Sequence, residues 1–340
     1  MPSAPAQPFD DIRALFAQMP EASPSACAAV ELRERELVKP AGSLGRLEEI
    51  AAWVAAWQDR ESPRIDRPFA VVFAANHGVA AHGVSAFPQA VTRQMLETFA
   101  AGGGAVNQIA ATYGIGLKVF ELALDHPTGD ITKEAALDER GAAATFAFGM
   151  EAIAGEPDLL CLGEMGIGNT TIAAAIYTAL YGGEVRSWTG RGAGVDDAGL
   201  ARKTAAIETA LAHHAGTLGD PLEIMRRLGG REICALAGAI MAARLQRIPV
   251  VLDGYVVCAA AAILHAMNPA ALDHCIAGHV SAEGDHGEVL RRLGKKPLLD
   301  FGMRLGEASG AVLAAGLVKA AVACHTGMAT FEQAGVSGKS

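Results

Sequence analysis

Short apolar runs alternate with longer amphipathic segments along most of the 340-residue chain. The runs span too few residues for helices and contain many branched side chains, which is typical of strands buried on both faces of a parallel sheet. We predict strands at residues 69–75, 117–124, 159–162, 185–188, 248–252 and 274–277.

The segments between these runs carry apolar residues at helical spacing. We predict helices at residues 88–113, 169–181, 196–215, 230–245 and 254–267. Strands that alternate with helices in this way form parallel sheets with right-handed crossovers. The predicted fold class is therefore α/β, a Rossmann-like parallel sheet flanked by helices.

The two ends of the chain have a different pattern. Residues 1–8 are rich in proline, alanine and serine and are predicted to be a disordered tail. Helical spacing over residues 9–19, 25–38 and 43–60 precedes the first strand. We therefore predict a small helical domain over residues 9–65, followed by a large α/β domain over residues 66–311.

Composition excludes several classes of partner. The net charge of −9 and the lack of lysine or arginine runs argue against nucleic acid or an anionic membrane. No stretch reaches the roughly 20 apolar residues of a membrane span, and the first residues lack the basic and apolar segments of a signal peptide. The six cysteines are scattered without a CxxC pair, which is typical of core residues in a reducing cytoplasm.

Polar or glycine-rich loops follow four of the predicted strands. They begin at Asn76, Gly163, Gly190 and Asp253. Ligands bind beyond the carboxyl ends of the strands in open parallel sheets. We therefore expect these loops to share one face and to form the site.

The loop at residues 163–171, GEMGIGNTT, ends a strand and begins a helix. Backbone N–H groups and the helix dipole at such a point can hold a phosphate, with the Thr170 and Thr171 hydroxyls in reach. The loop matches neither a Walker loop nor the GxGxxG fingerprint of dinucleotide folds. Loop flexibility alone is the alternative explanation for its glycines.

Positive charge follows the next glycine-rich loop, GRGAGVDD at residues 190–197. Arg191 lies within the loop, and Arg202 and Lys203 lie on the predicted helix after it. A cation at this place can complete a phosphate site. The alternative is a solvated helix face, and the sequence does not separate Arg202 from Lys203.

A polar cluster occupies residues 278–288, GHVSAEGDHGE. Its members are His279, Ser281, Glu283, Asp285 and His286. Metal-ligand spacing such as HExxH is missing, so we predict no metal. We interpret Ser281 as a hydrogen-bond donor to a phosphate or a sugar.

Glu307 lies between glycines in FGMRLGEASGA, residues 301–311, at the start of a nearly uncharged helical pattern. The dipole at a helix N-terminus favours the charged carboxylate, whereas apolar surroundings favour the neutral acid. Opposed effects of this kind produce a proton acceptor near neutral pH. The alternative is an ordinary glutamate in the first turn of a helix.

Six motifs in this order resemble the nicotinate-nucleotide:dimethylbenzimidazole phosphoribosyltransferase family. They are KPAGSLGRLE at 39–48, NHGV at 76–79, GEMGIGNTT at 163–171, LDG at 252–254, HVSAE at 279–283 and MRLGEASGA at 303–311. The resemblance implies a homodimer whose large catalytic domain surrounds a parallel sheet. It also implies that a C-terminal helix, at about residues 312–335, joins the small helical domain.

The family transfers the 5-phosphoribosyl group of nicotinate mononucleotide to 5,6-dimethylbenzimidazole and makes the lower-ligand nucleotide of cobalamin. Carried over by motif, Glu307 is expected to be the general base and Glu164 the second carboxylate of the pocket. The expected substrate-binding residues are Gly166, Asn169, Thr170, Lys203 and Ser281, together with Phe87, Met165, Leu305 and Gly306. Two positions depart from the family, since Asn76 replaces a frequent aspartate and Phe87 replaces a small polar residue of some members. The preferred base therefore stays open.

The chemistry that the resemblance implies needs no cofactor and no metal. The nicotinate nitrogen is already cationic and leaves as a neutral ring, whereas the incoming benzimidazole must lose its N–H proton, which Glu307 would accept. Because a β-linked nucleotide becomes an α-linked product, we expect a single displacement with inversion at C1′.

Two other functions are consistent with parts of the pattern. One is a nucleotide-dependent oxidoreductase on a doubly wound sheet, although the dinucleotide fingerprint and its acidic ribose partner are missing. The other is a sensor of nucleotides or bases without catalysis, which would have no need of Glu307 and Glu164.

Overall fold

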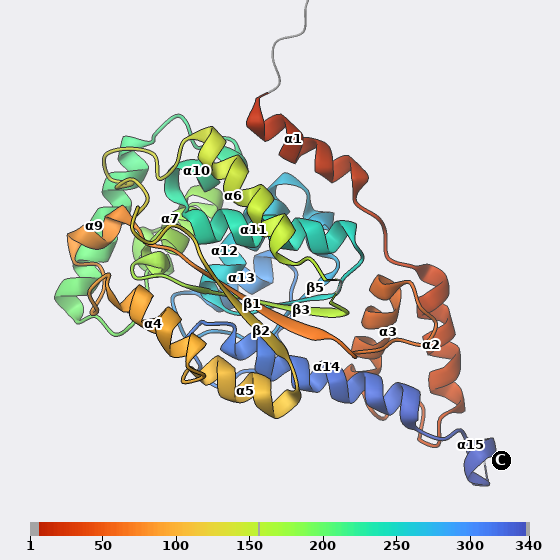
Figure 1. Cartoon of the computed structure of the whole chain (residues 1–340). Coiled ribbons are helices and arrows are strands. Elements are labelled where there is room, and N and C mark those ends of the chain that lie inside the picture. Colours follow the sequence, from red (N-terminus) through yellow and green to blue (C-terminus); the bar gives the residue numbers. More distant parts are fainter. Residues whose placement is uncertain (1–6, 156, 338–340) are drawn as a thin grey trace, which may run out of the picture.

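The computed structural model describes residues 7–155 and 157–337, which form an α/β fold around a five-stranded parallel sheet (Figure 1). The sheet order is β2-β1-β3-β4-β5. The strands are β1 (Pro68–Ala74), β2 (Gly116–Glu121), β3 (Leu159–Met165), β4 (Val250–Leu252) and β5 (Cys275–Ala277). The predicted fold class is confirmed.

The strand order changes direction at β1, because the next two strands of the sequence lie on its two opposite sides. β2 pairs with one edge of β1, and β3 pairs with the other. The loops that leave the carboxyl ends of β1 and β3 therefore run to opposite faces of the sheet and leave a crevice between them. Open α/β sheets bind their ligands at such a point.

Residues 185–188 were predicted to be a strand, and this prediction was wrong. They form the short helix α8 (Val185–Trp188). Trp188 packs against the aromatic rings of the preceding helix, with centroid distances of 5.7 Å to Tyr177 and 5.9 Å to Tyr181. The apolar residues of this run thus stabilise a local aromatic cluster. The prediction failed because a four-residue pattern does not distinguish a strand from a buried helical turn.

Helices cover both faces of the sheet (Figure 1). On the first face lie α6 (Glu139–Ala152), α7 (Asn169–Tyr181), α10 (Pro221–Leu228), α11 (Arg231–Leu245) and α12 (Tyr255–Met267). On the second face lie α3 (Arg46–Gln58), α5 (Ala105–Tyr113) and α14 (Ser309–Gly327). The strands alternate accordingly, since Val71 and Phe73 of β1 join the first core and Ala70 and Val72 join the second.

The remaining described helices lie at the ends and edges of the sheet. They are α1 (Pro8–Leu15), α2 (Pro24–Glu36), α4 (Val91–Ala100), α9 (Asp197–His213), α13 (His286–Arg292) and α15 (Phe331–Ala334), with 3-10 turns at Phe16–Gln18, Gly78–His82 and Pro269–Leu272. The single helix predicted over residues 88–113 is broken into α4 and α5, because Gly102 has a φ of 79°. The sequence pattern had not indicated α6, α10 and α13.

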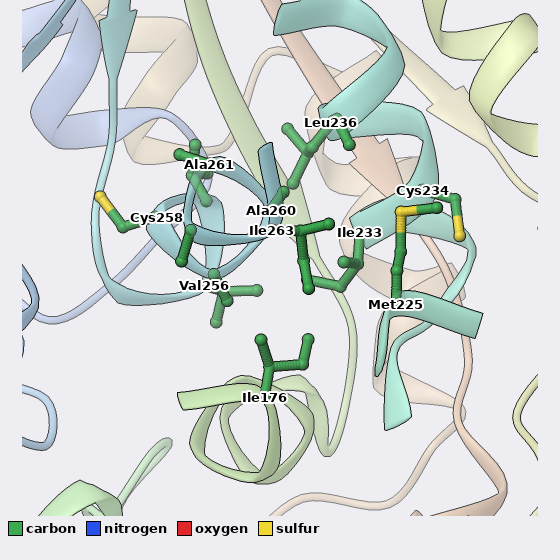
Figure 2. Packing of buried hydrophobic residues seen from close by; sticks show 14 of the residues in the cluster. Ile176, Met225, Ile233, Cys234, Leu236, Val256, Cys258, Ala260, Ala261 and Ile263 are labelled. Carbon is green, nitrogen blue, oxygen red and sulfur yellow. The ribbon is translucent and has the colours of Figure 1, made fainter. Parts of the chain in front are cut away.

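Aliphatic side chains fill the space between the helices of the first face. Figure 2 shows Ile176 of α7 pointing toward Val256 of α12, with Ile233 of α11 beside Ile263. α6 and α11 approach still more closely through glycines. A Cβ atom on Gly238 of α11 would lie 1.9 Å from the carbonyl oxygen of Phe146.

α14 contributes many of the buried residues in the core of the second face. Of the described helices, it is the one long and apolar enough to cross a membrane, with a mean hydropathy of 1.4. Val312, Ala315 and Val318 are fully buried against the rest of the protein. Its apolar surface is therefore used in packing on β3, β4, α3 and α5.

The two chain ends meet beside the sheet. α2 and α3 pack against each other and against α14. The Val38 N–H donates to the Ala329 carbonyl oxygen over 2.9 Å, and the Nδ1 atom of His325 lies 2.6 Å from the Glu34 carboxylate. The domain boundaries at residues 65 and 311 stay a prediction.

α1 packs elsewhere than predicted. Phe9 and Ile12 are buried in the core of the first face, and the Phe9 N–H donates to the Glu139 carboxylate of α6 over 3.1 Å. The first helix of the predicted small domain therefore lies on the large one. Of the predicted tail, residues 1–6 lie outside the described residues, and Pro8 already begins α1.

Candidate active site

A cavity of about 400 Å³ opens at the carboxyl ends of the strands. Its walls come from segments that are far apart in the sequence, between residues 84 and 307. All the predicted site residues except Lys203 line it: Phe87, Glu164, Met165, Gly166, Asn169, Thr170, Ser281, Leu305, Gly306 and Glu307. The loops expected to share one face thus surround one cavity.

Glu307 lies in a turn immediately before α14. Glu307 and Ala308 both have left-handed backbone conformations, with φ of 63° and 64°, which residues other than glycine seldom adopt. The turn is held by the Glu307 N–H, which donates to the Glu164 carbonyl oxygen over 3.2 Å, and by the Ser309 hydroxyl, which donates to the Gly306 carbonyl oxygen over 2.6 Å. Glu307 is therefore not a glutamate of the first helical turn.

The surroundings of Glu307 suit a proton acceptor. The residue is 5% exposed, and its Oε2 atom has no hydrogen-bond partner among the described residues. Burial, and secondarily the charge of Asp253, raise the pKa of Glu307 to about 7. Near neutral pH this carboxyl group can therefore take up and release a proton readily.

Glu164, at the end of β3, is a second carboxyl group whose pKa is raised. It is 7% exposed, and the Asn169 side-chain amide donates to its Oε2 atom. Burial, together with the charges of Asp253, Glu232 and Glu307, raises the pKa of Glu164 well above its usual range, although the Asn169 hydrogen bond opposes the shift. Two carboxyl groups in one cavity with different proton affinities can take different parts in a reaction.

The wall of the cavity formed by the start of α7 is suited to an anion. α7 begins there at Asn169, after Gly168 with a φ of 96°. The N-terminus of this helix and its backbone N–H groups favour negative charge. The hydroxyl groups of Thr170 and Ser281 belong to the same cavity.

Lys203 of α9 lies behind this wall and not in it. Its side chain is fully buried, and its Nζ atom donates to the Thr170 hydroxyl and to the Gly190 carbonyl oxygen, each over 2.8 Å. The Glu283 carboxylate is 3.5 Å away. Burial lowers the pKa of Lys203, and Glu283 opposes that shift. Because the Thr170 oxygen accepts from Lys203, its own proton is free to point into the cavity.

The loop after α8 reaches the cavity through Gly192. Both carboxylate oxygens of Glu283 accept from the Gly192 N–H over 2.8 Å, and Arg304 donates to the Gly192 carbonyl oxygen over 2.7 Å. These bonds connect three segments that are distant in the sequence. The prediction that residues 190–197 lie at the site therefore agrees with the structure, although the segment before them is a helix.

An apolar wall completes the cavity. Val91 and Met95 come from α4, and Val84 comes from the loop before it. Phe87 and Leu305 stand at the mouth, 50% and 56% exposed. Sequence analysis predicted the helix but had no signal that its apolar residues face the site.

The polar cluster at residues 278–288 divides into two parts. His279, Ser281 and Glu283 line the cavity. The His286 Nδ1 atom accepts from the Ser281 N–H over 2.8 Å, and Asp285 caps α13. Burial lowers the pKa of His286 to about 3. Within the described residues no group of three or more histidine, cysteine, aspartate or glutamate residues is placed to hold a metal ion.

Asp253 is a site residue to which sequence analysis assigned no role. It follows β4 directly and is fully buried, and its Oδ1 atom accepts from the Ala311 N–H of α14 over 2.8 Å. Its position after a strand was the available signal. Its contact with a helix 58 residues later was not visible in the pattern.

The chain is similar to known phosphoribosyltransferases in sequence and in structure. A family model described as phosphoribosyltransferase matches residues 19–336. The nicotinate-nucleotide–dimethylbenzimidazole phosphoribosyltransferase of Methylocella silvestris is 69% identical over 336 residues, which cover 99% of this chain and 98% of that one. The enzyme of the same name from Rhizobium etli is 65% identical over 332 residues, which cover 98% of each chain. The crystal structure of CobT from Thermus thermophilus matches with a TM-score of 0.85 and 42% identity, and covers 93% of this chain and all of that one.

Proposed function

The chain belongs to the nicotinate-nucleotide–dimethylbenzimidazole phosphoribosyltransferase family, and we propose that its cavity transfers the 5-phosphoribosyl group of nicotinate mononucleotide to 5,6-dimethylbenzimidazole. The products are α-ribazole 5′-phosphate and nicotinate, and the reaction belongs to cobalamin biosynthesis. Relatives of this identity over the whole chain give no support to an oxidoreductase or to a sensor without catalysis.

The observation that carries the mechanism is the buried Glu307 carboxyl group, whose pKa is raised to about 7. One ring nitrogen of the base attacks C1′, and the bond from C1′ to the nicotinate nitrogen breaks. The bonding electron pair neutralises the pyridinium ring, so the leaving group needs no proton. The N–H proton of the incoming base passes to Glu307, and the product is left neutral at its ring.

The roles of the two carboxyl groups follow from their proton affinities. Burial and the neighbouring negative charges raise the pKa of Glu164 well above its usual range, which favours the protonated form that adds no second negative charge beside the reacting ring. Glu307 is then the group that accepts the proton. Asn169 keeps the Glu164 side chain in place through the hydrogen bond to its Oε2 atom.

The phosphate binds at the N-terminus of α7. The Thr170 hydroxyl donates to it from the helix, and Ser281 donates from the loop after β5. Lys203 supplies positive charge from behind Thr170 and orients its hydroxyl. Anchoring the phosphate holds C1′ in line with the two rings, which contributes to the rate by positioning.

The base lies against the apolar wall. Phe87, Met165 and Leu305 belong to the same cavity as Glu307, and flat apolar surfaces suit a planar aromatic ring. Gly166 and Gly306 line the same cavity, and Gly306 lets the loop approach Glu164 closely, because a Cβ atom on Gly306 would lie 2.5 Å from the Glu164 Oε1 atom.

We also infer that the enzyme works in the cytoplasm as a homodimer. The cysteines of the described residues are free, which suits a reducing compartment. The dimer rests on the family resemblance. Sedimentation equilibrium of the purified protein measures the mass of the assembly, and a monomer at working concentration would contradict the inference.

The reaction is tested by incubating the protein with nicotinate mononucleotide and 5,6-dimethylbenzimidazole. Chromatography and mass spectrometry should detect nicotinate and ribazole phosphate in equal amounts, and nuclear magnetic resonance should assign the α linkage. Either substrate alone is the control. Binding of both compounds without product would contradict the proposed transfer.

A further inference from the structure

The N-terminus of α14 holds a buried carboxylate. Asp253 is fully buried below the turn that carries Glu307. Its Oδ1 atom accepts from the Ala311 N–H over 2.8 Å, and its Oδ2 atom has no hydrogen-bond partner among the described residues. α14 has 19 residues, so its dipole adds to the attraction for a negative charge at this end.

His279 lies on the other side of the same carboxylate. Its Nε2 atom is 3.7 Å from the Asp253 Oδ1 atom, and its ring packs against Gly310, where a Cβ atom would lie 2.0 Å from the ring. Burial raises the pKa of Asp253, whereas the His279 charge and the backbone N–H groups lower it. The Ala311 N–H, the helix dipole and the His279 imidazole each favour a negative charge on Asp253 and oppose the effect of its burial.

Several charged or titratable groups surround Glu307. Glu164 comes from β3, Asp253 follows β4, His279 follows β5, and Arg304 belongs to the same loop as Glu307. Of these, Asp253 is the one whose charge raises the pKa of Glu307. Asp253 itself does not line the cavity, so it acts on the reaction through its neighbours, which are Glu307 with its turn and the Glu164 carboxyl group.

We propose that Asp253 is a positioning residue for the proton transfer, which fixes the turn of Glu307 and Ala308 on α14 and strengthens Glu307 as a base by its charge. The proposal rests on the proposed role of Glu307 in the transfer. It helps to explain why a turn with two consecutive left-handed residues persists, since the first turn of α14, directly after Glu307, is tied to one buried carboxylate through the Ala311 N–H.

Asp253→Asn tests the effect of the charge. Asparagine keeps an oxygen that can accept from Ala311, but the side chain is neutral. Glu307 then ionises at lower pH and is a weaker base. The acid limb of the kcat–pH profile should move to lower pH by roughly one unit or more, and the kcat plateau above it should fall several-fold, because a weaker base accepts the proton less effectively. The KM for nicotinate mononucleotide should stay close to that of the parent protein.

Asp125→Asn is the matched control, because it removes the same charge from a side chain that is 80% exposed. Its pH profile should match that of the parent protein. An Asp253→Asn profile whose acid limb stays in place would overturn the effect of the charge, even if kcat fell.

Asp253→Glu tests the position of the charge, and it also serves if Asp253→Asn does not fold. Glutamate keeps the charge but moves it by one methylene group away from its N–H partner. The acid limb should stay near its place while kcat falls, and a parent-like kcat would overturn the positioning role. Turnover by the parent protein decides the proposed function separately.

Discussion

At the scale of single residues, the cavity separates two carboxyl groups by their surroundings. Glu164 receives a hydrogen bond from Asn169 and is surrounded by the charges of Asp253, Glu232 and Glu307. At Glu307, which lies in a strained turn, the charge of Asp253 adds to the effect of burial on the pKa. Motifs in the sequence predicted that both residues belong to one pocket. They did not indicate which one holds its proton, because that depends on burial and on charges from β4 and α11.

Glu307→Gln should remove most of the turnover. Glutamine has nearly the same shape but cannot accept the proton of the base, so kcat should fall by about 10²–10⁴. The KM for nicotinate mononucleotide should change little, because the proposed phosphate contacts lie on α7 and on the loop after β5. Steady-state release of nicotinate measures both constants. Glu97→Gln, an exposed change on α4, is the control, and near-parent activity of Glu307→Gln would exclude the assigned base.

The pH dependence of kcat follows from the raised pKa of Glu307. The ionised carboxylate is the active form, so protonation below pH 7 should remove activity. kcat should rise with pH through about 7 and level off above it. The residual activity of Glu307→Gln should lack this limb. A parent profile that is flat across this range would contradict the role of Glu307.

Lys203 was predicted to bind phosphate. Because its side chain is fully buried beside Thr170 and Glu283, a substitution there should affect both the binding of nicotinate mononucleotide and the stability of the fold. Lys203→Met keeps the stem but removes the donors to Thr170 and Gly190, so the KM for nicotinate mononucleotide should rise roughly 10-fold or more. The same change leaves the buried Glu283 without its cation and should lower the free energy of unfolding.

The double variant Lys203→Met/Glu283→Gln separates binding from stability. Glutamine removes the unpaired charge and can still accept from Gly192, so urea denaturation should show recovered stability while KM stays high. Recovery of both quantities would mean that Lys203 acts on the fold alone.

At the scale of the elements, the prediction was accurate for long helices and strands whose packing is visible in the local hydrophobic pattern. It failed for short elements and for elements held by residues distant in the sequence. α7 and α12 carry enough helical spacing to be located from the sequence, and β1 is long and uninterrupted. α8 spans four residues, and its Trp188 is held by rings of α7 that no local pattern reveals. α6 was missed because its contact with α11 depends on glycines in both helices, and the hydrophobic pattern does not register a residue that packs through its backbone.

Gly238→Ala tests this close approach. The added methyl group would meet the Phe146 carbonyl oxygen of α6, since its Cβ atom would lie 1.9 Å away. The helices must move apart, and the free energy of unfolding should fall by about 3 kcal/mol or more. Gly287→Ala on α13 is the control, because nothing lies within 4 Å of its added Cβ atom. Urea denaturation measures both variants, and equal midpoints would contradict the close packing of α6 on α11.

At the scale of the whole molecule, the sequence predicted a parallel sheet flanked by helices. This succeeded because chain direction and crossover handedness leave few arrangements for alternating strands and helices. The placement of α1 was not predictable in the same way. Phe9 and Ile12 mark a helix face that needs a partner, but the pattern does not say whether that partner is α6 or the neighbouring α2.

Phe9→Ala decides to which part of the molecule α1 contributes. Phe9 is 2% exposed in the core that includes α6 and α11, so its truncation should lower the free energy of unfolding by about 3 kcal/mol. Asp11→Ala, an exposed change on the same helix, should have little effect. Tryptophan fluorescence locates the loss, because Trp188 lies on α8 whereas Trp53 and Trp57 lie on α3.

In a Trp53→Phe/Trp57→Phe background, Trp188 alone reports on the sheet and the helices of its first face. If α1 stabilises this part, Phe9→Ala should lower the urea midpoint seen by Trp188, while kcat in the folded protein stays near that of the background. The cavity lies at the carboxyl ends of the strands, and none of its lining residues belongs to α1. An unchanged Trp188 midpoint, together with a loss of stability seen by Trp53 and Trp57 in a Trp188→Phe background, would instead assign α1 to the helices at the chain ends.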